Sequence, residues 1–67
     1  MIDAKKIGER LISLRGDRKR QTVANDLKIS LSALQMYENG KRIPRDEVKV
    51  RFALYYGTTI EAIFFAA

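Results

Sequence analysis

The chain has 67 residues, 46% of them hydrophobic, which permits one domain (residues 1–67) with a small core and argues against disorder. It contains no cysteine and no histidine, so disulfides and thiolate metal sites are excluded, and we expect neither an enzyme nor a metal or other cofactor. The formal net charge of +5 makes an acidic polymer or an anionic membrane surface the first partner to consider.

Hydrophobic periodicity predicts helices along the whole chain. The first is expected to end near 15–16, and a second is expected at 20–27, after the polar run RGDRKR. A third fits 31–39, a fourth runs from about 45 to 56, and a short fifth follows. The apolar residues that define their inward faces are Ile7, Leu11, Leu14, Val23, Ala24, Leu27, Ala33, Leu34, Tyr37, Val48, Phe52, Ala53, Tyr56, Ile60, Ile63 and Phe64.

Capping residues mark several of these boundaries. Ser30 is a good N-cap for the third helix, because its hydroxyl can accept a hydrogen bond from a free amide of the first turn. Gly40 supplies the left-handed residue that stops this helix, and Gly57 ends the fourth. Thr58-x-x-Glu61 has the form of a capping box for the fifth helix. No strand signal appears, so the sequence predicts an all-α fold of five short helices around one core.

Only Lys28, Ile29 and Ser30 separate the second helix from the third. A connection this short forces a steep crossing, which is the geometry of a helix-turn-helix, here spanning about 20–39. Ala24 supports this interpretation, because a small side chain lets the two helices approach closely. On the pattern alone, a plain bundle with one tight turn stays open as an alternative. Lys28 also stands where glycine would be less strained.

Four stretches, IGERLISLR, VANDLKIS, SALQMYENGKRIP and YYGTTIEAIFF, together resemble the lambda-repressor-like (XRE, Cro/C-one type) family of DNA-binding domains. The resemblance covers about 7–65, and YENGKRIP is its most specific part. It implies a five-helix lambda-repressor-like DNA-binding domain whose third helix enters the major groove of double-stranded DNA.

The second helix departs from the family pattern. The connection GDRKR before it is shorter than usual, and Lys28 replaces the glycine of the turn. Family members often have Thr or Ser capping this helix and Gln opening it, where this chain has Lys19 and Arg20. We therefore expect a helix without a side-chain cap, and a charged phosphate contact from Arg20.

A cluster of cations follows the third helix in NGKRIPR. In the family geometry the end of this helix lies beside the DNA backbone, where amides around 39–41 can donate to a phosphate and Lys41 and Arg42 add charge. A solvated surface is the alternative reading of these cations. The predicted phosphate contacts are Arg20, Gln21, Ser30, Asn39, Lys41, Arg42 and Arg45.

The outward face of the third helix carries the predicted base-reading residues, Leu31, Ser32, Gln35 and Met36. Two apolar side chains on a groove-facing surface suit thymine methyl groups, Gln35 can pair with adenine, and Ser32 can contact several bases. The set favours A·T pairs.

Glu38 needs a different role, because a carboxylate beside phosphates is repelled. The resemblance implies that Glu38 pairs with Arg15 at the end of the first helix, which would fix the third helix against the first. A free surface glutamate is the alternative.

A weak homodimer is expected, because a single domain reads too few base pairs to stand out in a genome. Family members usually bind pseudo-palindromic half-sites about one helical turn apart. Phe64 and Phe65 are the predicted dimer contact, with Phe65 exposed beside the core. Alternatively, Phe65 folds back on Tyr55 or Phe52.

The sequence thus predicts a sequence-specific DNA-binding transcriptional regulator, with a repressor preferred. An antitoxin or other protein-interaction module whose DNA binding is secondary is the alternative, although no added toxin-binding segment is visible. A membrane-surface peptide fits poorly, because the basic residues fall at helix ends and turns. No membrane span, secretory signal or small-molecule site is evident, so we expect a cytoplasmic protein.

Overall fold

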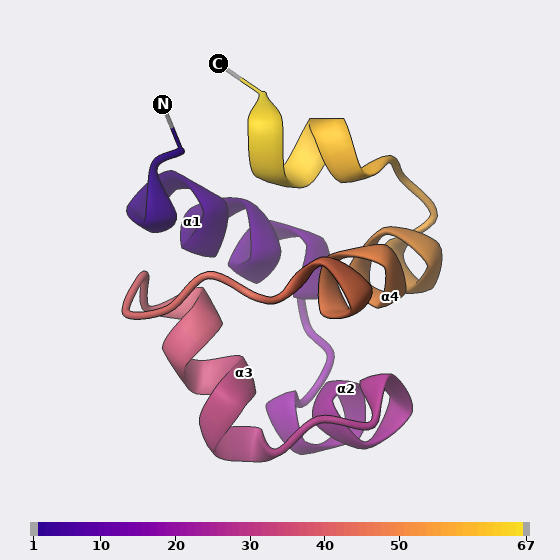
Figure 1. The fold of residues 1–67 in the computed structure, drawn as a ribbon. Coiled ribbons are helices and arrows are strands. Elements are labelled where there is room, and N and C mark those ends of the chain that lie inside the picture. The colour runs from indigo at the N-terminus through magenta and orange to yellow at the C-terminus, as the bar shows by residue number, and fades with distance from the viewer. Residues whose placement is uncertain (1, 67) are drawn as a thin grey trace.

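A computed structural model describes residues 2–66 as five helical elements (Figure 1). They are α1 (Ala4–Arg15), α2 (Arg20–Leu27), α3 (Leu31–Glu38), α4 (Asp46–Tyr56) and a short π-helix, η1 (Glu61–Phe65). In Figure 1, α1 crosses the middle of the molecule, with η1 above it and the pair α2 and α3 below. The predicted all-α fold is confirmed, and none of residues 2–66 lies in a strand.

One core joins all five elements. Phe52 is completely buried at its centre, with ring centroids of Tyr37 and Phe64 at 6.0 and 6.2 Å. Leu14 is a correction to the predicted core, because it is exposed at the rim of a shallow pocket between α1 and the segment 58–63. The buried apolar residues are Ile7, Leu11, Val23, Ala24, Leu27, Leu34, Tyr37, Val48, Phe52, Ala53, Ile63 and Phe64.

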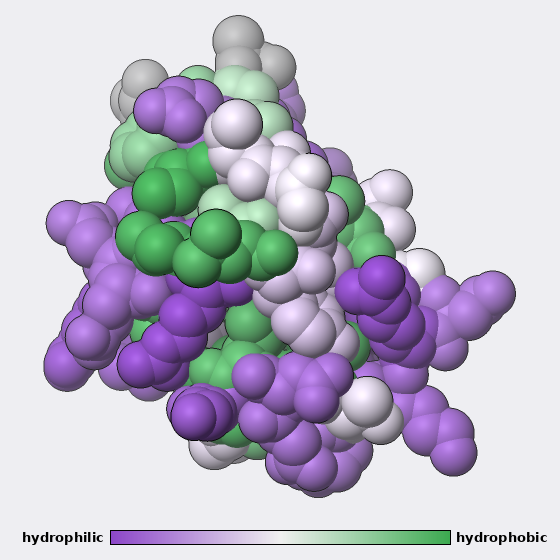
Figure 2. All heavy atoms as spheres, turned by 90° about the vertical axis from the view of Figure 1, so that its right-hand side faces the viewer, coloured by the Kyte–Doolittle hydropathy of each residue, from purple (hydrophilic) through white to green (hydrophobic). Residues whose placement is uncertain are grey.

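The surface is not uniformly polar. Seen from the side on which α4 ends, hydrophobic residues gather between hydrophilic side chains that project at the margins (Figure 2). Among residues 2–66, Leu54 on α4 is the most exposed large hydrophobic residue, at 77%. None of the helices described between residues 2 and 66 combines the length and the hydrophobicity needed to cross a bilayer.

The predicted caps hold for α3 and α4 but not for η1. Ser30 Oγ accepts from the amide of Ala33 at 3.0 Å, and Gly57 ends α4 in the left-handed conformation (φ 65°). At η1 the capping oxygen is Thr59 Oγ1, which accepts from the amide of Ala62 at 3.1 Å. The capping box predicted to begin at Thr58 is therefore wrong by one residue, because the amide that needs an acceptor lies three residues after Thr59.

α1 and α3 touch through their backbones at Gly8. A Cβ atom at Gly8 would stand 2.9 Å from the carbonyl carbon of Glu38 and 3.0 Å from the carbonyl oxygen of Tyr37, and it would collide with the carbonyl oxygen of Glu38. Glycine inside a helix costs about 1 kcal/mol relative to alanine. That cost is compensated here by an approach of α1 to α3 that only glycine permits.

Arg10 holds the C-terminal element against α1. Its two terminal guanidinium nitrogens donate to the carbonyl oxygens of Ile63 and Ala66, both at 2.8 Å. Carbonyl groups at the end of a helix have no partner within the helix, so a cation is favoured there. Arg10 thus fixes the position of η1, and with it the position of Phe65.

Candidate nucleic-acid interface

Two backbone hydrogen bonds close the end of α2 at the turn that leads to α3. Lys28 adopts the left-handed conformation (φ 59°, ψ 43°), and it is the one non-glycine residue between 2 and 66 with a positive φ. The amide of Lys28 donates to Asn25 O at 3.1 Å, and the amide of Ile29 donates to Ala24 O at 3.0 Å. This pair of bonds stops α2, and the chain leaves in a new direction as α3 (Figure 1).

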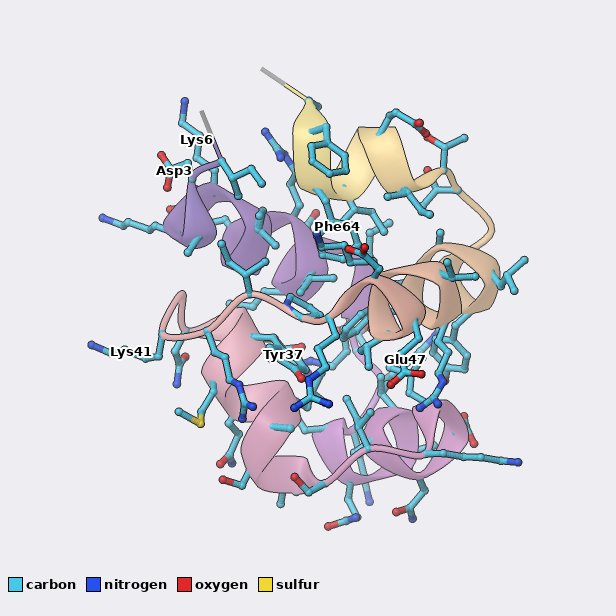
Figure 3. All side chains as sticks on the ribbon, in the orientation of Figure 1. Asp3, Lys6, Tyr37, Lys41, Glu47 and Phe64 are labelled. Carbon is cyan, nitrogen blue, oxygen red and sulfur yellow. The ribbon has the colours of Figure 1, made fainter. Side chains whose placement is uncertain are left out.

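α3 has distinct inward and outward faces. Figure 3 shows Tyr37 pointing from α3 into the molecule. The buried residues of this helix are Leu34, Tyr37 and Glu38, and the exposed set includes Ser32, Gln35 and Met36. Leu31, at the start of the helix, is half-buried. The predicted base-reading residues therefore lie along the outer side of one helix, and Leu31 is the most covered of them.

One carboxylate connects three helices. Arg15 Nε donates to Glu38 Oε2 at 2.8 Å, and Arg20 Nε donates to Glu38 Oε1 at 2.9 Å. The Glu38 side chain is 0% exposed, against 14% for Arg15 and 42% for Arg20. The hydrogen bond to Glu38 raises the pKa of Arg15 above its usual value. The implied pair of Arg15 and Glu38 is present, and a free surface glutamate is ruled out.

The contact between Arg20 and Glu38 was not anticipated, because sequence reasoning assigned Arg20 to a phosphate. Both functions are compatible, since the bond to Glu38 uses Nε and the side chain is still partly exposed. Lys19 before it makes no side-chain cap, as expected. Gln21 follows, and its amide nitrogen donates to Asn25 Oδ1 at 2.9 Å.

The turn after α3 directs its amides inward. The prediction that amides around 39–41 are free for a phosphate is wrong, because the left-handed Gly40 (φ 73°) turns them back onto α3. Side chains remain for that role, and Asn39, Lys41, Arg42 and Arg45 are all exposed. Figure 3 shows Lys41 projecting outward from this turn. The three amide bonds are Asn39 N to Gln35 O (2.9 Å), Gly40 N to Tyr37 O (3.3 Å) and Lys41 N to Met36 O (2.9 Å).

The basic run between α1 and α2 is partly engaged within the domain. The guanidinium of Arg18 lies over the rings of Tyr55 and Tyr56 in α4, at 5.4 and 5.6 Å from their centroids. The hydroxyl of Tyr55 bonds to Asp26 Oδ2 at 2.7 Å. The hydroxyl of Tyr56 is buried without a partner among the described residues, and burial raises the pKa of Tyr56 to about 12. Arg18 is therefore exposed like its neighbours but also contacts α4 through these two rings.

The two residues predicted to form a dimer contact differ in exposure. Phe64 is 2% exposed and packs in the core, so its assignment to a contact between copies of the chain is wrong. Phe65 is 54% exposed, and its ring centroid lies 5.2 Å from Lys49 Nζ. Among residues 2–66 its ring forms no aromatic pair with Tyr55 or Phe52, so nothing described supports the alternative that it folds back on them. An exposed aromatic ring is left near the C-terminal end.

Comparison with known proteins agrees with this geometry. A sequence model of a family described as helix-turn-helix matches residues 10–63, which is most of the chain, while no curated protein matches. The short turn between α2 and α3 and the family match together define the chain as a helix-turn-helix protein. The chain belongs to the lambda-repressor-like (XRE) helix-turn-helix family, as its resemblance implied.

This family binds DNA and is not an enzyme family, so membership supports the general function of a DNA-binding regulator. No group of three acidic side chains in the part of the chain from 2 to 66 could hold a metal ion.

Proposed function

We propose that the protein is a transcriptional repressor that binds a pseudo-palindromic operator in double-stranded DNA as a weak homodimer. The observation that carries the proposal is the outer face of α3, where Ser32, Gln35 and Met36 are exposed while the inner face is anchored in the core. In this proposal α3 enters the major groove with that face toward the base edges. A repressor is preferred because occupying an operator is sufficient to block transcription.

Cations on both sides of α3 support the same orientation. Lys41, Arg42 and Arg45 follow the helix, and all are exposed. On the other side Arg20 and Gln21 open α2, while the Ser30 hydroxyl accepts from Ala33 and keeps its own proton for a phosphate oxygen. Contacts of this kind to the backbone fix the register of a reading helix without specifying sequence.

Binding sites selected from random duplexes, followed by substitutions of two kinds, test this proposal. Gln35→Ala and Met36→Ala should each relax preference at a defined base position and leave the salt dependence unchanged. For Gln35 the expected loss is about 1–3 kcal/mol, the value of a good bidentate contact. Lys41→Ala should weaken binding to all sequences alike and lower the slope of log affinity against log salt by about one unit. Fluorescence anisotropy across a salt series measures both quantities.

The two kinds of substitution serve as controls for each other. Parent-like specificity in both the Gln35→Ala and Met36→Ala variants would show that α3 is not the reading helix. A changed base preference with an intact salt slope in Lys41→Ala would remove Lys41 from the phosphate contacts.

The dimer has its own test in Phe65, because this ring is exposed while Phe64 closes the core. Phe65→Asp should abolish cooperative binding to the full operator and leave the affinity for a half-site unchanged. Leu54→Asp is the matched control, since Leu54 is also an exposed apolar residue but lies on α4. Sedimentation and titration of full and half operators measure the outcome, and unchanged cooperativity in Phe65→Asp would exclude this contact.

A further inference from the structure

We propose that the first turn of α1 is part of the DNA-contacting surface, with Lys5 binding a phosphate beside the position of Lys41. The inference rests on the proposed function, because it adds a contact to the same interface. Lys5 lies before residues 10–63, which the family model matches, so that match assigns Lys5 no role.

The start of α1 packs directly on the turn that follows α3. A Cβ atom at Gly40 would stand 3.0 Å from Lys5 Cα, 3.2 Å from Lys5 N and 3.3 Å from Ala4 O. The two stretches of backbone therefore meet with no side chain between them. Because Lys41 follows Gly40 directly, the side chains of Lys5 and Lys41 leave neighbouring points of the surface, and both are exposed.

Lys5 and its neighbour Lys6 lie on different flanks of α1. Gly8, one turn after Lys5, faces the backbone at the end of α3, which places Lys5 on the flank nearer to that end. Lys6 belongs to the other flank, and Figure 3 shows it pointing away from Lys41. The shallow pocket on that flank is lined by Lys6, Glu9, Arg10 and Ser13.

The chemistry of this turn suits a phosphate contacted by the side chain. Asp3 Oδ1 accepts from the amides of Lys5 and Lys6 at 3.0 and 3.2 Å, so the first amides of α1 are already occupied. The ammonium of Lys5 is the group left to offer, and it forms no ion pair within residues 2–66; the same holds for Lys41. The side chains of Lys5 and Lys41 start from adjacent points of the surface, and neither ammonium group is neutralised by a carboxylate of residues 2–66. Such a pair attracts an anion, here a phosphate of the DNA backbone.

The pair Lys5→Gln and Lys6→Gln tests the inference, because each removes one positive charge from the same turn. Lys5→Gln should lower the salt slope for operator and random duplexes by about 0.9, so that raising salt from about 50 to about 200 mM weakens binding about threefold less than in the parent. Lys6→Gln should leave the slope unchanged. Circular dichroism and thermal unfolding verify that both variants fold as the parent does.

Equal effects of the two substitutions would overturn the inference, since long-range charge alone would then explain them. An unchanged slope in Lys5→Gln would overturn it as well. Lys41→Ala in the same assay separates this failure from failure of the proposed function. If Lys41→Ala lowers the slope and Lys5→Gln does not, α1 is outside the interface; if neither lowers it, the proposed surface itself is wrong.

Discussion

Replacing Gly8 with alanine should remove about 3 kcal/mol or more from the free energy of unfolding. In an ordinary helix this change gains about 1 kcal/mol, but here the added methyl group meets backbone atoms of Tyr37 and Glu38, which cannot rotate away. Overpacking typically costs about 1–3 kcal/mol and more where neighbours are fixed. A domain of this size has only about 3–10 kcal/mol in total. Urea denaturation followed by circular dichroism should therefore show a large fall in the midpoint.

Gly57→Ala is the control for the Gly8 substitution. Gly57, unlike the helical Gly8, has a left-handed backbone that favours glycine (φ 65°), and a Cβ atom there would meet nothing within 4 Å. Its cost should be about 1 kcal/mol, from backbone strain alone. A Gly8→Ala variant as stable as the parent would mean that α1 and α3 can separate freely, and that their close crossing does not constrain the fold.

Replacing Glu38 with glutamine should destabilise the domain by about 3 kcal/mol, because it leaves Arg15 largely buried beside a neutral amide. The amide keeps the size of the carboxylate, so the loss reports charge rather than packing. Arg20 should contribute less than Arg15, since its side chain is 42% exposed and solvent screens it. The same denaturation assay measures the change.

Double-mutant cycles separate the two arginines. We expect a coupling energy of about 2 kcal/mol between Glu38 and Arg15, and less than about 1 kcal/mol between Glu38 and Arg20. Arg15→Gln and Arg20→Gln supply the single variants for these cycles. Equal couplings would contradict the assignment of Glu38 mainly to α1, and a loss below about 1 kcal/mol in Glu38→Gln would show that the buried carboxylate contributes little.

The helices were predictable because their signals are local. Apolar spacing predicted the bounds of α2 as observed. For α3 and α4, the spacing together with the caps at Ser30 and Gly57 predicted the bounds within one residue. The strain at Lys28 was also predictable, since it stands at the turn position where glycine would be less strained, and its backbone is left-handed in the structure. The helical spacing of apolar residues and the capping of a helix depend only on residues a few positions away. These signals can therefore be recognised without knowing how the helices pack.

The contacts between helices were not predictable from such patterns. The role of Gly8 depends on where the end of α3 passes, thirty residues further along the chain. The second partner of Glu38 depends on how α2 is placed against α3, which its charge pattern does not encode. The amides after α3 were misassigned because Gly40 indicates that the helix stops but not where its freed donors point. Of these contacts between helices, the family resemblance implied only the ion pair of Glu38 with Arg15.

The division of α3 into two faces also bears on how such a protein can diversify. Leu34, Tyr37 and Glu38 are buried and hold the helix, while Gln35 and Met36 lie on its exposed side. Substitutions at exposed positions usually change stability by no more than about 0.5 kcal/mol. Under the proposed mode of binding, the copies of a duplicated gene can therefore acquire different DNA specificities through substitutions at these positions, with little change in stability. Regulatory circuits that use this domain can diverge through a few surface codons, without compensating changes in the protein interior.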